Sequence, residues 1–119
     1  MFPASLLEKL FVKGTLKNTP TGFEFKMKNI IDSGTLIGLG ALEVDEATYQ
    51  PAALTIKVAD KEMRGDAITR AASLPVRAYA EIIVAVEGAP LEAGVHKITV
   101  LLNTREAGRL QLTVNEPIS

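Results

Sequence analysis

The sequence contains no cysteine and no tryptophan, and aromatic residues make up only 5% of it. Without cysteine the chain has no disulfide framework, no thiolate nucleophile and no thiolate metal site. Sugar-binding sandwiches present aromatic platforms, and single-stranded nucleic acid is held by aromatic side chains interleaved with basic ones. The shortage of rings argues against both classes, since only Tyr49 and Tyr79 are candidates for exposed aromatic side chains.

The chain also lacks an excess of either charge, with 13 Lys and Arg against 14 Asp and Glu. This balance argues against a nucleic acid or a membrane surface held by bulk electrostatics. The longest apolar run, residues 82–86, is too short to cross a bilayer. The first residues lack the basic region and unbroken apolar stretch of a signal peptide. We therefore expect a cytoplasmic protein with no nucleic-acid or membrane partner.

What the sequence has in quantity is alternation of apolar and polar residues. Its 119 residues are 47% hydrophobic, which suffices for one domain, residues 1–119, with its own core. Alternation with a period of two marks half-buried strands of antiparallel sheets. It recurs about seven times, which predicts an all-β, two-sheet antiparallel sandwich, with a small antiparallel barrel as the alternative. The predicted strands are residues 12–17, 23–28, 35–44, 53–58, 76–86, 95–102 and 110–114.

Two segments depart from this alternation. Residues 1–11 predict a short helix, because Ser5 and Glu8 have the spacing of a capping box. Residues 60–75 predict a crossover between the sheets, containing a short helix that Asp66 would cap.

The C-terminal segment predicts a hairpin, with a turn over residues 103–108 in which Gly108 takes the left-handed conformation. Residues 94–100 and 106–114 resemble the last hairpin of immunoglobulin-like and fibronectin type III-like modules. This resemblance implies an immunoglobulin-like sandwich, although the Cys…Trp…Cys core of true immunoglobulin domains is missing.

The chain is also similar to short prokaryotic proteins that carry the label hydroxymethylglutaryl-CoA reductase. A reductase of that kind needs a nicotinamide-binding domain and a catalytic set of Lys, Glu, Asp and His in a much longer chain. No such machinery can be assigned in these 119 residues, so we infer no reductase activity from the label.

Gly38 and Gly40 follow a strand, and Asp60 lies about 20 residues downstream, as in part of a dinucleotide-binding fingerprint. Glu43 occupies the place of the third glycine, and the flanking chain is rich in strands rather than alternating strands and helices. We interpret the two glycines as a bend in the strand, and we expect no cofactor.

Residues 60–66 carry acids and a glycine at positions that begin a calcium loop, but Arg64 stands where a ligand oxygen belongs. We therefore expect no metal ion. The same stretch contains Arg64, Gly65 and Asp66, an adhesion tripeptide in extracellular ligands. Because secretion signals are lacking, we interpret the tripeptide as a solvated turn.

His96 is the only histidine, and it shares parity with Ile98, so it should lie at the core-facing end of a strand. It could act as a general base near Arg77 and Glu81. However, it has no cysteine partner, and no serine lies in a nucleophile-elbow context. We expect a structural histidine and no catalytic residue.

Two adjacent acids, Asp45 and Glu46, could form half of a carboxylate pair. Consecutive acids in a polar loop are usually solvated, and this is the interpretation we favour for them.

One face of predicted strand 76–86 carries Arg77, Tyr79, Glu81, Ile83 and Ala85 and is less polar than a solvated face should be. We predict that these five residues form an interface with a partner protein or a second copy of the chain. Cover by another element of the same chain is an equal alternative.

Three functions follow from these patterns. The first is a non-catalytic interaction or assembly module that self-associates. The second is a sandwich or barrel that binds a small apolar ligand, which a cavity lined by Leu36, Leu42, Ile56 and Val84 would favour. The third is a small enzyme with a site near His96.

Overall fold

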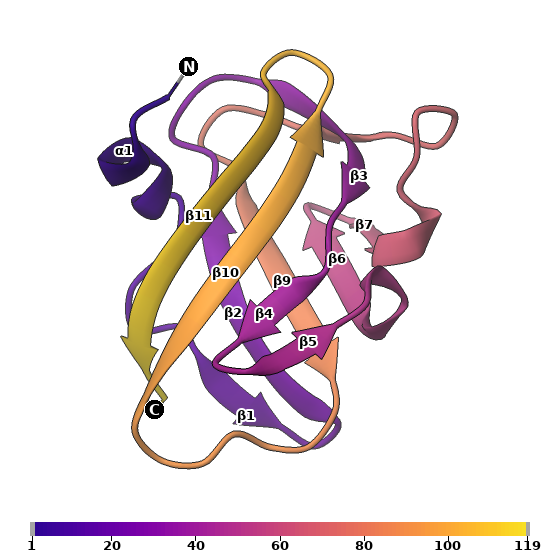
Figure 1. The fold of residues 1–119 in the computed structure, drawn as a ribbon. Helices are drawn as coiled ribbons and strands as arrows, with labels where there is room; N and C mark the ends of the chain where they lie inside the picture. Colours follow the sequence, from indigo (N-terminus) through magenta and orange to yellow (C-terminus); the bar gives the residue numbers. More distant parts are fainter. Residues whose placement is uncertain (1, 119) are drawn as a thin grey trace.

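Two antiparallel sheets face each other in the computed structural model, which describes residues 2–118 (Figure 1). The first sheet has the strand order β1-β2-β9-β6-β7, and the second has β5-β4-β10-β3-β8 with β11 also paired to β10. The first sheet contains β1 Lys17–Thr19, β2 Gly22–Lys28, β6 Leu54–Val58, β7 Lys61–Arg64 and β9 Glu81–Glu87. The second contains β3 Gly34–Leu39, β4 Leu42–Val44, β5 Ala47–Tyr49, β8 Leu74–Val76, β10 Val95–Thr104 and β11 Gly108–Pro117. Because the sheets share no strand, the fold is the predicted sandwich and not a barrel.

The alternating side chains fill the space between the sheets. In β2 the inward residues Phe23, Phe25 and Met27 are almost completely buried, while Lys28 at the strand end is exposed. The opposing sheet contributes the same kind of inward residue, such as the fully buried Ile98. Fully burying a side chain of this size contributes about 1.5–3 kcal/mol, so this shared core holds the two sheets together.

Predicted strand 35–44 is a single path along β10 that bends at Gly40. β3 pairs with the end of β10 and β4 with its beginning, and the register shifts by one residue between them. A Cβ on Gly40 would lie 2.7 Å from the Cβ of Leu101 on β10. The strand is interrupted at Gly40, as the bend predicts, whereas Gly38 stays within β3 and is paired with Asn103. β4 rather than a helix follows the two glycines.

Predicted strand 76–86 is wrong, because the chain changes sheets within it. β8 pairs with β3 in the second sheet, whereas β9 lies between β2 and β6 in the first. Residues 77–80 make the turn between them, with Tyr79 at φ 66°. The backbone N–H of Tyr79 donates to the carbonyl of Asn29 at 2.6 Å, which pulls the chain out of the strand direction. In the sequence, Ala78 and Ala80 continue the apolar alternation through this turn, but their small side chains do not enforce a strand.

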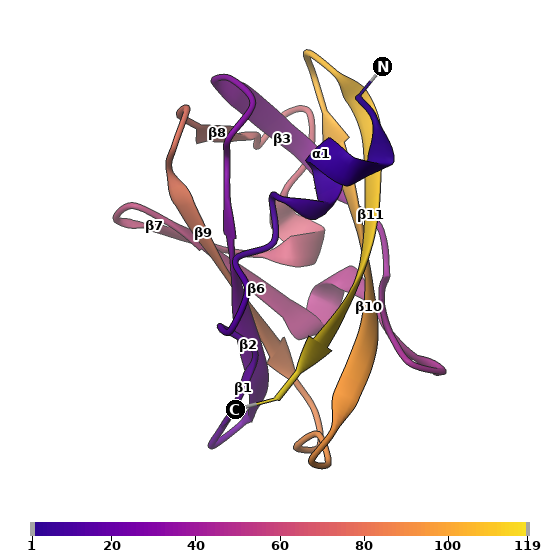
Figure 2. The ribbon, with the colours of Figure 1, turned by 90° about the vertical axis from the view of Figure 1, so that its left-hand side faces the viewer.

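The N-terminal helix is present as α1 Ala4–Glu8, but its predicted capping box is wrong. Pro3 is the N-cap, and its carbonyl accepts hydrogen bonds from the N–H groups of Leu6 and Leu7. Ser5 consequently lies inside the helix, where its hydroxyl cannot cap the first turn. The helix packs against β11 at one side of the sandwich (Figure 2).

The described residues form eleven strands rather than about seven. Two of the four extra strands, β5 and β7, belong to hairpins that were missed, and the other two arise because predicted strands 35–44 and 76–86 are each divided in two. β6 and β7 turn at Ala59, and β4 and β5 turn at Asp45, each of which has φ 55°. The short helix predicted after Asp66 is replaced by a 3₁₀ turn, Gly65–Ala67, and residues 65–73 then pass from the first sheet to the second. The left-handed conformation predicted for Gly108 is confirmed at φ 71°.

No helix within residues 2–118 is both long and apolar enough to span a bilayer.

Candidate functional site

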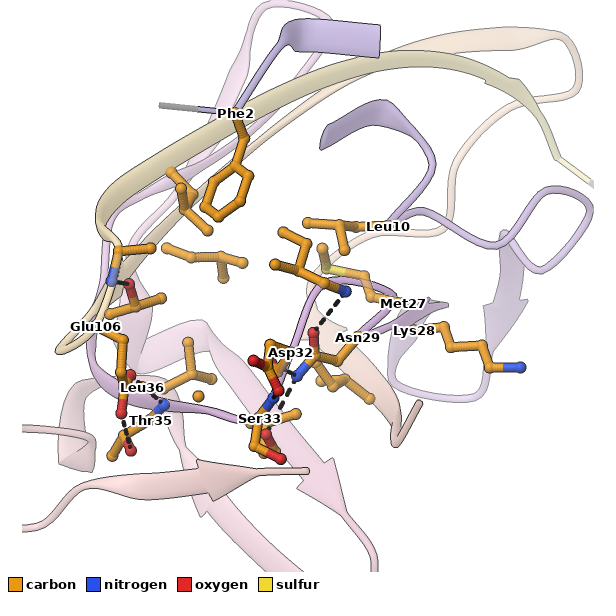
Figure 3. Close-up of a pocket in the computed structure, with 18 residues that line it drawn as sticks. Phe2, Leu10, Met27, Lys28, Asn29, Asp32, Ser33, Thr35, Leu36 and Glu106 are labelled. Carbon is orange, nitrogen blue, oxygen red and sulfur yellow. Dashed lines mark hydrogen bonds between the residues drawn. The ribbon is translucent and has the colours of Figure 1, made fainter. Parts of the chain in front are cut away.

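A cavity of about 280 Å³ opens between the two sheets at one end of the sandwich (Figure 3). At this end β2 and β10 finish, while β3, β9 and β11 begin. The first sheet contributes Met27 and Ile82, which are paired across β2 and β9. The second contributes the inward residues of four strands, namely Leu36, Val76, Leu102 and Leu110. These side chains continue the core, so the cavity has an apolar interior.

The N-terminal segment covers one side of the cavity. Phe2 and Leu10 line it, and Figure 3 shows both on the side opposite Glu106 and Thr35. Leu10 is buried, whereas Phe2 is only half-buried. The helix between these residues contacts β11, so the cover depends on how α1 docks onto that strand.

Polar residues form the mouth of the cavity, and the loop between β2 and β3 supplies three of them, Asn29, Asp32 and Ser33. Asn29 organises this loop, since its Oδ1 accepts from the N–H of Ile31 at 3.2 Å. Its Nδ2 donates to the carbonyls of Asp32, Val76 and Arg77, at 2.7, 3.2 and 3.3 Å. Asn29 therefore ties the loop to the turn that follows β8.

Glu106, in the turn between β10 and β11, also lies at the mouth of the cavity. Its Oε1 accepts from the N–H of Thr35 at 2.8 Å, and its Oε2 accepts from the Thr35 hydroxyl at 2.9 Å. The bonds from Thr35, side-chain bond first, lower the pKa of Glu106 from its ordinary value, and nearby Arg105 adds a smaller effect. A carboxylate thus stands at the mouth at neutral pH.

The cavity expected around Leu36, Leu42, Ile56 and Val84 exists only in part. Leu36 lines the cavity at the open end. The other three surround a separate void of about 20 Å³ at the centre of the sandwich, which is room for about one water molecule. The larger cavity therefore lies away from three of the four predicted residues.

His96 is buried, as its parity predicted, and both of its ring nitrogens have partners. Its Nδ1 lies 2.6 Å from Oδ2 of Asp45, and its Nε2 lies 2.7 Å from the carbonyl oxygen of Glu92. Both partners are acceptors, so the ring is best satisfied when both nitrogens carry protons. The bond to Asp45, followed by the bond to Glu92, accordingly raises the pKa of His96.

Asp45 is exposed, as expected of a loop acid, but its carboxylate also has partners within the protein. Besides His96, its carboxylate accepts from the backbone N–H of Lys97 at 2.9 Å, and its own N–H donates to the carbonyl of Lys97 at 2.8 Å. These contacts lower the pKa of Asp45, with the His96 bond as the largest cause. Asp45 therefore fastens the β4–β5 turn onto β10.

The structure does not bring His96 together with Arg77 and Glu81. His96 lies at the start of β10 and Glu81 at the start of β9, and these starts are at opposite ends of the sandwich (Figure 1). Arg77 belongs to the turn before β9 and lies near the Glu81 end. Among residues 2–118, no group of three His, Cys, Asp or Glu side chains is arranged to hold a metal ion.

The five predicted interface residues divide into two places. Arg77 and Tyr79 lie on the sheet-changing turn, where the side chain of Tyr79 is 70% exposed. Glu81, Ile83 and Ala85 lie on the outer face of the first sheet, where Ile83 is flanked by Lys26 and Lys57. Ile83 and Ala85 are half-buried there.

Two other sequence features have structural roles. Arg64 and Asp66 form a bidentate ion pair with each other across Gly65, which is buried, so the tripeptide is a self-paired turn. Tyr49 is not an exposed platform, since its ring packs edge-on against Phe23 with centroids 5.4 Å apart.

Sequence reasoning missed most of the cavity, including Phe2, Asn29 and Glu106. One signal was present, because Ile30 and Ile31 interrupt the alternation in the loop before β3. Apolar residues in a connecting loop indicate that the loop covers part of the core. The sequence did not indicate that Glu106, from a distant hairpin, would join it.

A family model described as "Hydroxymethylglutaryl-CoA reductase, N-terminal domain" matches residues 6–119. The match covers both sheets and the cavity walls, and of the cavity residues it leaves out only Phe2. No curated protein matches the sequence.

Proposed function

We propose, since this chain belongs to the family "Hydroxymethylglutaryl-CoA reductase, N-terminal domain", that it is a non-catalytic module which binds one small apolar molecule. The observation that carries the proposal is the cavity of about 280 Å³ between the sheet ends. Its apolar interior and polar mouth have the usual composition of a small-molecule site.

The energetics of packing support an occupant. The centre of the same core is filled almost completely, so the sequence is able to pack the sandwich densely. Apolar surface left without neighbours costs stability, on the order of 20 cal/mol per Å² of cavity surface. A bound apolar molecule would recover that contact energy at the open end.

The family name refers to a reductase, but the cavity does not suit a coenzyme A thioester. Such a substrate carries several phosphate charges, which need basic groups or a helix N-terminus. Lys28 is the one cationic residue among those lining the cavity, and the acids Asp32 and Glu106 also line it. We therefore place the ligand in a different chemical class from the reductase substrate.

A fluorescent titration tests the proposal. The neutral probe N-phenyl-1-naphthylamine should bind the protein once and become brighter as it leaves water. Ala107→Trp places a bulky ring on an exposed lining residue and should abolish the signal. Ala52→Trp, at an exposed alanine that does not line the cavity, is the matched control and should bind as the parent does. An equal signal from both variants would overturn the proposal.

Self-association is the second candidate function, and the exposed ring of Tyr79 favours it. A 70% exposed aromatic side chain offers a contact for a second copy, and half-buried Ile83 and Ala85 on the outer face of the first sheet offer another. Light scattering over a concentration series tests this, because a constant monomer mass would exclude it. We also propose that the sandwich is of the immunoglobulin-like kind, which the ladder of ten residue pairs between β10 and β11 supports.

A further inference from the structure

Most hydrogen-bond donors at the cavity mouth are already used within the protein, and among the described residues the side-chain exceptions are the hydroxyl of Ser33 and the ammonium of Lys28. The hydrogen bonds of the Asn29 amide go to backbone groups of the surrounding loops. The Thr35 hydroxyl and N–H both donate to Glu106, and the N–H of Ser33 donates to Asp32 Oδ1 at 2.7 Å. A ligand therefore meets few free donors at this rim.

Acceptors remain available at the same rim. Each carboxylate oxygen of Glu106 accepts one bond, although an ionised carboxylate has about four lone-pair sites in all. Within the described residues, Oδ2 of Asp32 accepts no bond. Asp32 and Glu106 are both exposed, so a polar group of a bound molecule could reach them from the mouth.

The charges around the mouth are also unequal. Lys28 lines the cavity, but its side chain extends away from it in Figure 3. Arg105 lies beside Glu106, and its guanidinium is directed to the hydroxyl of Ser73 at 3.5 Å. The groups that face the mouth are thus the two carboxylates, opposite the apolar cover formed by Phe2 and Leu10.

We infer that the ligand is amphipathic, with an apolar body between the sheets and a protonated amine held between Asp32 and Glu106 at the mouth. This inference rests on the proposed function, because it names the ligand class of the same cavity. An ammonium group supplies several donors and no acceptor, which complements the rim. A carboxylate of the same skeleton would meet like charge and few free donors.

Three probes of one carbon skeleton test the inference, namely octylamine, 1-octanol and octanoate. At neutral pH and low salt, each should displace N-phenyl-1-naphthylamine, with octylamine binding tightest and octanoate weakest. Exposed ion pairs are weak, so we expect octylamine to bind only about three- to tenfold more tightly than octanol. Raising the salt concentration should reduce that ratio, since the carboxylates are at the surface.

Variants identify the groups responsible. Asp32→Asn and Glu106→Gln should each lower octylamine affinity while leaving octanol affinity unchanged, and the double variant should bind both probes equally. Glu43→Gln, at an exposed acid outside the cavity, is the control and should keep the parent ratio. Unchanged octanol binding also shows that a variant is folded.

The outcomes separate the two proposals. If all three probes displace the reporter equally, or octanoate is preferred, the ammonium inference is wrong and the apolar site stands. If none of the probes nor the reporter binds, the proposed function fails and the inference fails with it. If the double variant keeps the parent's ratio of octylamine affinity to octanol affinity, the role of Asp32 and Glu106 is likewise overturned.

Discussion

Nδ1 of His96 and Oδ2 of Asp45 lie 2.6 Å apart, joining the start of β10 to the β4–β5 turn. The two residues are 51 positions apart in the chain. With the Glu92 carbonyl on Nε2, the buried ring bridges two loops at the end of the sandwich opposite the cavity. This contact stabilises the fold rather than supplying a free base, because neither ring nitrogen is left without a partner.

The His96–Asp45 contact predicts a pH-dependent stability. The raised pKa of His96 stabilises the fold fully below a pH of about 6.5, and this contribution is lost as the pH rises through the folded-state pKa. The lowered pKa of Asp45 acts in the other direction, since its contribution is present above its ordinary pKa and is lost as the pH falls through its folded value. The pair should therefore stabilise most in mildly acidic solution.

Urea unfolding from pH 5 to pH 9 measures this effect. The difference in unfolding free energy between the parent and His96→Gln should shrink as the pH rises. A difference that stays constant across that range would show that His96 does not gain a proton on folding.

Gly40→Ala should destabilise the fold, because the new Cβ would lie 2.7 Å from Leu101 Cβ. Overpacking of this kind costs about 1–3 kcal/mol. Gly34→Ala is the control, since its Cβ would meet its nearest neighbour at an ordinary 3.6 Å. The measurement is the midpoint of thermal unfolding of both variants. Equal midpoints would show that the backbone at Gly40 can move away from Leu101 without a cost in stability.

Phe2→Ala should weaken ligand binding more than it weakens the fold. Phe2 is half-buried and lines the cavity, so its removal opens the cover while leaving the sheets intact. We expect at least about a threefold loss of probe affinity, with less than about 1 kcal/mol lost in unfolding free energy. Phe25→Ala, at a fully buried ring, is the contrasting case and should cost about 3–5 kcal/mol. Unchanged probe affinity in Phe2→Ala would remove this residue from the site.

Tyr79→Gly separates strain from association. Tyr79 has φ 66°, a conformation that costs a residue with a side chain about 1–2 kcal/mol and glycine nothing. The variant should therefore unfold at the same temperature or higher, although it loses an aromatic side chain. If the protein self-associates through this turn, the same variant should be monomeric by light scattering. A marked loss of stability would show that the ring packs on the fold.

Local chemistry made several features predictable. Gly108 adopts the left-handed conformation because a bulged hairpin loop requires it. His96 is buried because parity along a strand places every second residue on one face. These features depend on neighbours within a few residues, which is the range that a sequence pattern describes.

The sequence by itself determined that the chain forms antiparallel strands, and it determined which residues of most strands face the core. Only the tertiary structure decided that β8 and β9 belong to different sheets, because a period of two specifies a face but not the strand that pairs with it. Tertiary structure also decided the cavity, which Phe2, Asn29 and Glu106 line from three segments that are distant in the sequence. Whether such segments pack together or leave a space depends on the fit of side chains across the sandwich, which alternation along one strand does not specify.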